Sequence, residues 1–212
     1  MSESVGEVFS FAGRHAPVAG CTLSGRLAKD IDYYALAAHT DISAEIYPYD
    51  KFLAVLDGEA EAYGAQRSLA RAGRCVLLPR DRAVGIQTDS GAVYIEFLIR
   101  SAENMNEMIK AGEVFSLAET VPYRTGEIVN MDLVHHEKMK FVVMAFDEGT
   151  GLDEHAAPGE AMIFALDGQG VIGYEGQEHT IKAGENFCFA KGGRHWVRAD
   201  GKFKMALLLT LE

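Results

Sequence analysis

The sequence predicts an all-β protein made of two similar halves in tandem. Three observations support this prediction. Short apolar runs recur at near-regular spacing and are separated by Gly or Asp-Gly turns. The 22 glycines of the chain accompany no long helical pattern. The segment Gly-Glu-Val-Phe-Ser occurs twice, at residues 6–10 and 112–116, and later segments stay in step with it.

The internal repeat continues along both halves. Leu-Asp-Gly at residues 56–58 matches the same triplet at 166–168, and Ala-Gly at 72–73 matches Ala-Gly at 183–184. The offset between the copies grows only from 106 to 111 residues, as small loop insertions would produce. A period of about 105 residues has the length of a domain and is too long for a solenoid. We therefore expect two domains, residues 1–106 and 107–212.

Apolar runs in the first copy predict five strands. They cover residues 33–38, 52–56, 59–63, 74–78 and 92–99. A different pattern follows over residues 101–111, where Ser101 can cap a helix and Met105, Met108 and Ile109 lie three and four residues apart. We expect a short helix there, linking the two copies.

The second copy repeats the strand pattern. Its expected strands cover residues 141–146, 162–166, 171–174, 186–190, 196–198 and 203–211. Short strands with Gly turns between them are typical of a sandwich or a barrel.

Composition excludes several classes of function. A net charge of −11 argues against binding to nucleic acid, which needs a basic surface, and against binding to anionic membranes. No apolar run approaches the roughly 18 residues of a membrane helix, and the first residues do not form a signal peptide. The three cysteines form no C-x-x-C pair, which suits a reducing compartment. We expect a soluble cytoplasmic protein.

Two Gly-and-His segments of the second copy carry a family resemblance. The first holds Gly149, His155 and Gly168, and the second holds Gly184, Gly192 and His195. In spacing they resemble the two signature motifs of the cupin family. The resemblance implies that each copy is a double-sheet jelly-roll barrel. The sequence departs from the motifs at three positions, where the second histidine, the glutamate and the proline of the family are replaced by Ala157, Ala161 and Ala190.

The resemblance also implies a site in the C-terminal barrel. Metal-binding cupins use three histidines and one glutamate, and this chain keeps two of these positions, His155 and His195. If a divalent Zn, Mn, Fe or Ni ion is bound, His135 is the expected third ligand, provided that it points inward. Glu160 lies one residue before the glutamate position, so strand alternation turns it away unless the Pro158-Gly159 turn resets the register.

Without a metal, the histidines become polar groups in a partly apolar ligand pocket. Trp196 is the expected aromatic wall of that pocket, and Glu160 is a candidate ligand-binding residue there.

The first copy has lost the ligand positions. Glu45, Tyr47, Lys51 and Val84 stand where the family has ligands. We expect no metal there. Glu45 and Lys51 could pair with each other, either for structure or to form a pocket for a charged small molecule.

Two classes of function remain. One is a small-molecule-binding protein, and the other is a metal-dependent enzyme of the dioxygenase, isomerase or lyase type. The loss of ligands favours binding. We expect a small-molecule ligand and a pseudo-dimer of barrels within one chain, with a homodimer left open.

Overall fold

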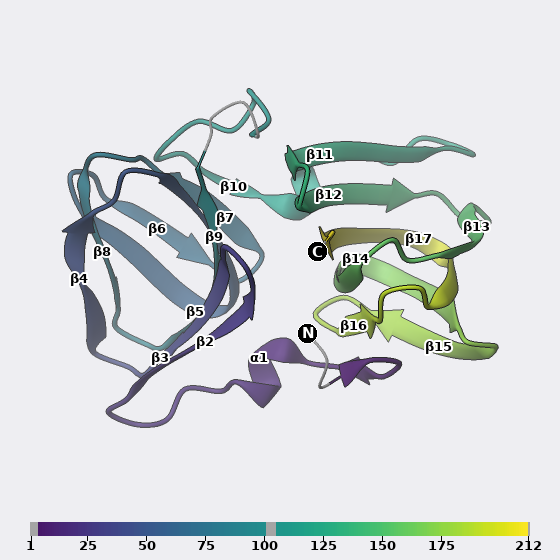
Figure 1. Cartoon of the computed structure of the whole chain (residues 1–212), viewed down its shortest axis with the longest axis horizontal. Coiled ribbons are helices and arrows are strands. Elements are labelled where there is room, and N and C mark those ends of the chain that lie inside the picture. The colour runs from purple at the N-terminus through teal and green to yellow at the C-terminus, as the bar shows by residue number, and fades with distance from the viewer. Residues whose placement is uncertain (1–3, 101–104, 212) are drawn as a thin grey trace. The chain divides into compact units, whose positions relative to one another are not determined.

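The computed structural model describes residues 4–100 and 105–211. It is an all-β fold with two compact units, which confirms the predicted fold class (Figure 1). The N-terminal unit comprises residues 12–116, and the C-terminal unit comprises residues 117–212 together with residues 1–11. This division differs from the expected boundary at residue 106. No helix in the described residues is long and apolar enough to cross a membrane.

The N-terminal unit is a barrel of two sheet layers. Its strands are β2 (Thr22–Ala28), β3 (Ile31–Leu36), β4 (Thr40–Ile46), β5 (Asp50–Gly64), β6 (Ser68–Arg71), β7 (Arg74–Leu78), β8 (Ala83–Thr88), β9 (Ala92–Ile99) and β10 (Val114–Ser116). One layer has the order β10-β7-β5-β9-β3-β2, and the other joins β4, β8 and β6 through β5. The 15-residue strand β5 therefore takes part in both layers.

The C-terminal unit repeats this topology. Its strands are β1 (Val8–Phe9), β11 (Ile128–His136), β12 (Met139–Phe146), β13 (Gly151–Ala156), β14 (Glu160–Tyr174), β15 (Gln177–Lys182), β16 (Asn186–Phe189) and β17 (Arg194–Thr210). The main path β1-β16-β14-β17-β12-β11 matches that of the N-terminal unit strand for strand. Two short helices complete the described fold, α1 (Phe11–Arg14) and the 3-10 helix η3 (Leu117–Glu119).

The repeated Gly-Glu-Val-Phe-Ser segments explain where the units divide. The first supplies β1, which pairs with β16, and the second supplies β10, which pairs with β7. The first segment precedes the first copy but pairs with a strand of the second copy. The second segment precedes the second copy but pairs with a strand of the first copy. This exchange places residues 1–11 with the second copy and extends the first copy to residue 116.

Two sequence expectations about turns and helices need correction. The Asp-Gly pairs at 57–58 and 167–168 do not end strands. They lie inside β5 and β14 next to bulges, where the pairing register shifts, and Gly58 and Gly168 have φ values of 68° and 71°. A bulge keeps the strand continuous while it bends.

Likewise, the expected helix does not form over residues 105–111; residues 101–104 lie outside the described part. The Asn106 side chain accepts from the Met108 amide at 3.0 Å and holds a turn instead.

Each barrel has its own apolar interior. In the C-terminal unit, alternate residues of β14, namely Ala161, Ile163 and Ala165, belong to the interior cluster together with Phe187 and Phe203. In the N-terminal unit, Leu53 and Val55 of β5 belong to the equivalent cluster. The alternation of side chains along a strand decides which residues face these interiors.

Candidate functional site

The two barrels place the same strand positions opposite each other. In the C-terminal unit, β13 pairs with β17 and sets His155 opposite His195. In the N-terminal unit, β4 pairs with β8 and sets Glu45 opposite Val84. The structure therefore supports the alignment of the copies that the sequence suggested, and residues can be compared position by position.

The histidine pair lies at one end of the C-terminal barrel. The ring centroids of His155 and His195 are 4.2 Å apart. His195 is 6% exposed and stacks on Phe189 with a centroid distance of 4.1 Å, whereas His155 is exposed. Burial lowers the pKa of His195, and the neighbouring His155 lowers it further, although a hydrogen bond to the Gly193 carbonyl opposes both effects. His195 is therefore held neutral.

The backbone fixes the orientation of both rings. His155 Nδ1 lies 2.8 Å from the Asp153 carbonyl oxygen, and His195 Nδ1 lies 3.2 Å from the Gly193 carbonyl oxygen. Because a carbonyl can only accept, each Nδ1 carries the proton in these bonds. The Nε2 atom of the neutral His195 ring is then left as an acceptor.

The residues around this pair do not fit a resident divalent metal. Ala157 and Ala161 are buried in the apolar interior. Within residues 4–100 and 105–211, no group of three or more His, Cys, Asp or Glu side chains is placed to hold a metal ion. Catalytic zinc sites use three protein ligands, and this pair supplies two.

The other expected site residues lie away from the pair. His135 is opposite Lys140 in the β11–β12 register, so the two share a face. Its exposed ring is 3.3 Å from Asp132 rather than turned inward. Glu160 is exposed and alternates with the inward Ala161, as strand parity predicts without a register reset. Trp196 alternates with His195 and packs under the Arg198 guanidinium, 4.7 Å from its ring.

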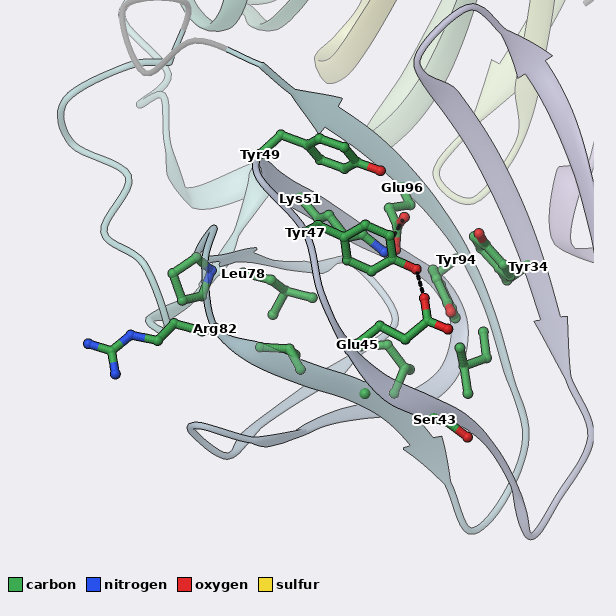
Figure 2. A pocket seen from close by; sticks show the side chains of 15 residues that line it. Tyr34, Ser43, Glu45, Tyr47, Tyr49, Lys51, Leu78, Arg82, Tyr94 and Glu96 are labelled. Atoms are coloured by element: carbon green, nitrogen blue, oxygen red, sulfur yellow. Dashed lines mark hydrogen bonds and ion pairs between the residues drawn. The ribbon is translucent and has the colours of Figure 1, made fainter.

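A pocket opens instead in the N-terminal barrel (Figure 2). Its cavity volume is about 40 Å³, which is space for roughly three water-sized groups. The four residues that replace the family's ligands all line it, and tyrosines and a second glutamate complete its polar lining. The polar lining residues are Tyr34, Ser43, Glu45, Tyr47, Tyr49, Lys51, Arg82, Tyr94 and Glu96.

A buried ion pair forms one wall of this pocket. Lys51 Nζ lies 3.0 Å from Glu96 Oε1, and the two side chains are 17% and 4% exposed. The ammonium also lies 3.7 Å from the centroid of the Tyr47 ring. Burial raises the pKa of Glu96, while Lys51 partly opposes that rise. A tethered cation therefore stands at the position that carries the glutamate ligand in metal-binding cupins.

The pocket tyrosines are held as neutral hydrogen-bond donors. Burial, with the nearby Glu96 carboxylate, raises the pKa of Tyr34 to about 12 and the pKa of Tyr94 well above its usual value. The Tyr47 hydroxyl donates to Glu45, and this bond raises the pKa of Tyr47. Tyr94 is 0% exposed, and its hydroxyl oxygen has no hydrogen-bond partner among the described residues.

The sequence predicted only part of this pocket. It placed Glu45, Tyr47, Lys51 and Val84 at one site, but the suggested pairing of Glu45 with Lys51 does not form, because Lys51 pairs with Glu96. Glu96 and Tyr94 were missed. The signal was present, since a carboxylate in the middle of the apolar strand Ala92–Ile99 has no partner along that strand.

Comparisons with known proteins agree with this architecture. Residues 142–211 match the family model described as Cupin domain. Among curated proteins, none matches the chain. In a solved structure, a Cupin 2 conserved barrel domain protein from Leptotrichia buccalis has a TM-score of 0.83 at 24% identity, over 99% of both chains.

Two further solved structures share the fold at lower identity. A variant of salicylate 1,2-dioxygenase from Pseudoaminobacter salicylatoxidans has a TM-score of 0.66 at 12% identity, over 98% of this chain and 84% of its own. Protein Ylba from E. coli has a TM-score of 0.58 at 13% identity, over 95% and 88%. Residues 142–211 therefore match a cupin domain, and the chain shares the fold of these solved structures over nearly its whole length.

Proposed function

We propose that this chain binds a small polar molecule in the pocket of its N-terminal unit, and that binding there uses the Lys51 ammonium in place of a metal. The observation that carries the proposal is the polar lining of this pocket, with the buried Lys51–Glu96 pair at its wall. The proposed site thus lies in the barrel that lost the family's motifs.

The C-terminal barrel indicates that the fold does not need these polar groups. By strand register, Ala161 and Leu207 stand where the N-terminal barrel has Lys51 and Glu96, and Met205 stands where it has Tyr94. A buried ion pair is often neutral or unfavourable for stability compared with apolar residues of similar size. Retention of the polar set in one barrel therefore supports a binding role over a structural one.

The histidine pair supports a second proposal, a polar-ligand site in the C-terminal barrel. The rings of His155 and His195 lie side by side, and His195 stacks on the aromatic ring of Phe189. The interior beneath them is packed with apolar side chains, among them Ala157 and Phe189. This packing leaves the pair less suited than the N-terminal pocket to enclosing a molecule, so we rank it second.

Both proposals are tested by measuring the thermal shift of the full chain with each member of a panel of small polar molecules. The N-terminal site is changed by Lys51→Met with Glu96→Leu, and the C-terminal pair by His155→Ala or His195→Ala. We expect the stabilising shifts to disappear only in the N-terminal variant. Loss only in the histidine variants would move the function to the C-terminal barrel.

The alternative, a metal-dependent enzyme of the dioxygenase, isomerase or lyase type, is tested by elemental analysis of the purified chain. Stoichiometric Fe, Mn, Ni or Zn that disappears with His155→Ala or His195→Ala would support this alternative and contradict a metal-free function.

A further inference from the structure

We propose that the molecule bound in the N-terminal pocket is a short amino alcohol in its ammonium form, whose N–H groups donate to Glu45 and whose hydroxyl meets the Lys51 ammonium and the Tyr94 hydroxyl. This inference rests on the proposed function of the same pocket and names the chemical class of its ligand. Figure 2 shows the residues that carry it in one pocket lining, with Glu45 on β4, Lys51 on β5, and Tyr94 and Glu96 on β9.

The charged groups that face this pocket carry one net negative charge. Arg82 belongs to the lining, but it is exposed and its guanidinium is directed away from the pocket (Figure 2). Lys51 alone then faces two carboxylates, Glu45 and Glu96, and it pairs with Glu96. Glu45 has no compensating cation among the lining residues. A bound monocation would bring the site to neutrality, whereas a bound anion would add to its negative charge.

The pocket tyrosines report the same negative potential. Burial raises the pKa of Tyr34 and Tyr94, and the Glu96 carboxylate raises both further. The pKa of Tyr47 is raised first by its hydrogen bond to Glu45, and then by burial and by the charges of both carboxylates. The negative charge of the carboxylates is therefore felt across the lining in spite of Lys51.

Both carboxylates keep acceptor capacity that the described residues do not use. A carboxylate has about four lone-pair sites. Glu45 accepts from the Tyr47 hydroxyl, and Glu96 accepts from Lys51. The N–H groups of a ligand ammonium can donate to such oxygens, and these bonds are charge-assisted. Because Glu45 is exposed, an ammonium can pair with it while it keeps part of its hydration.

The more buried groups of the pocket favour a hydroxyl on the same ligand. Lys51 has a 17% exposed side chain and uses one N–H donor toward Glu96, so it can donate another to a ligand oxygen. Tyr94 is 0% exposed, lines the pocket, and has a hydroxyl without a hydrogen-bond partner among the described residues. A ligand hydroxyl can accept from Lys51 and donate to the Tyr94 oxygen, and it adds no charge.

Spacing and volume limit the ligand to a short chain. Lys51 Nζ lies 3.7 Å from the centroid of the Tyr47 ring, and the hydroxyl of the same ring donates to Glu45. The Lys51 ammonium and the Glu45 carboxylate are therefore about one phenol ring apart. Two carbons with a polar group at each end can bridge this gap, and the cavity volume of about 40 Å³ leaves little room for a longer chain. Ethanolammonium is the simplest molecule of this class.

The test titrates the full chain with ethanolammonium and two analogues that have the same number of heavy atoms. Ethylene glycol replaces the ammonium with a neutral hydroxyl, and propylammonium replaces the hydroxyl with a methyl group. In ¹H–¹⁵N NMR spectra at pH 7, we expect saturable shifts in β4, β5 and β9 with millimolar ethanolammonium. Ethylene glycol should bind at least tenfold more weakly, and propylammonium several-fold more weakly. Potassium chloride at equal concentration controls for ionic strength and for unselective cation binding.

Matched variants locate the binding. Glu45→Gln removes the charge but keeps an oxygen that can accept from Tyr47. It should weaken ethanolammonium binding about tenfold, which corresponds to about 1.4 kcal/mol, and leave ethylene glycol binding unchanged. Asp41→Asn is the control, because Asp41 also lies on β4 and also accepts from a tyrosine hydroxyl, that of Tyr63, but lies outside the pocket lining. Tyr94→Phe should weaken ethanolammonium and ethylene glycol by the same factor.

Each outcome decides between the two levels of the proposal. If ethylene glycol, propylammonium or the potassium ion binds the pocket as tightly as ethanolammonium, the amino-alcohol assignment is wrong while the binding function stands. The same holds if Asp41→Asn weakens binding as much as Glu45→Gln. If none of these probes and no member of the polar panel shifts residues of the pocket, both fail. If ethanolammonium binding is lost in His195→Ala and kept in Glu45→Gln, the site lies in the C-terminal barrel and both fail.

Discussion

Replacing Lys51 with methionine should destabilise the N-terminal unit, because it leaves the buried Glu96 carboxylate without the cation that pairs with it. Glu96 has a 4% exposed side chain, and Lys51 is the cation that pairs with it. Loss of one partner of a buried pair costs about 3–5 kcal/mol. The loss of stability in Lys51→Met has an upper limit, since the Glu96 carboxyl group can take up a proton instead of staying charged.

This upper limit on the destabilisation follows from the pKa of a glutamate. Protonating a carboxyl group with an ordinary pKa of 4.5 at pH 7 costs about 1.36 kcal/mol for each of 2.5 pH units, or about 3.4 kcal/mol. In the variant, burial without Lys51 raises the folded pKa of Glu96 further. A raised folded pKa gives a contribution to stability that is present below the unfolded pKa and lost as pH rises. The destabilisation should therefore be about 3 kcal/mol at pH 7 and shrink toward about 1 kcal/mol near pH 4.5, where only the contact with Tyr47 is missing.

Urea unfolding followed by far-ultraviolet circular dichroism measures this free energy at both pH values. Trp196, the chain's one tryptophan, lies in the C-terminal unit, so its fluorescence reports the unit that should not change. The matched control is Lys51→Met combined with Glu96→Leu, which removes both charges and should recover most of the loss. A single variant as stable as the parent at pH 7, a cost independent of pH, or a double variant as unstable as the single would each refute the reasoning.

Three further predictions concern single positions. Tyr94→Phe should stabilise the ligand-free chain by about 1 kcal/mol in urea unfolding, because it removes a buried hydroxyl without a partner; a loss of stability would mean that the hydroxyl is satisfied. Gly58→Ala should cost more than about 2 kcal/mol, because its φ is 68° and a Cβ would lie 2.0 Å from the Gly91 oxygen, whereas Gly73→Ala, also at positive φ but facing open space, should cost only about 1 kcal/mol. Equal costs would argue against the bulge. Because the pKa of Tyr34 is raised to about 12, stability should fall as pH rises from 10 toward 12, and Tyr34→Phe should lessen that fall when tyrosinate absorbance and unfolding are followed together.

The sequence was sufficient to predict the fold because the relevant signals are local. Gly turns, apolar runs and a repeat with nearly constant offset predict an all-β chain of two similar copies. Strands without an apolar run, such as the largely exposed β4 and β13, were missed, and the jelly-roll arrangement came from the family resemblance. Preserved spacing within the motifs also fixes register, and the structure sets His155 directly opposite His195 as that spacing implies. What brings these two side chains together is strand length and alternation, both of which can be read from the chain.

The exchange of edge strands could not be predicted in the same way. Identity between residues 6–10 and 112–116 shows that the two segments are equivalent, but not which sheet each one joins. Pairing of β1 with β16 and of β10 with β7 depends on the path of the chain between the copies. The Asp-Gly pairs raise a related difficulty, because a glycine at positive φ serves a turn and a bulge equally well.

The family motifs and the proposed binding pocket lie in different barrels. The C-terminal copy has histidines, His155 and His195, at two positions where metal-binding cupins have ligands. Ala157 and Ala161 stand at the other two positions and belong to the apolar interior of that barrel. In the N-terminal copy three of the four equivalent positions hold polar residues, Glu45, Tyr47 and Lys51, and the fourth holds Val84.

The pairing of Lys51 with Glu96 has a chemical explanation. Lys51 brings a positive charge to the position of a metal ligand, and Glu96, from the neighbouring strand, compensates it within a low-dielectric interior. In the proposed site, the covalently attached Lys51 ammonium would supply the positive charge that a metal supplies elsewhere. If Lys51 and Glu96 had only a packing role, apolar residues such as those at the equivalent C-terminal positions would serve as well. Their persistence together with an unsatisfied Tyr94 hydroxyl is the strongest physical reason to look for the function in the N-terminal barrel.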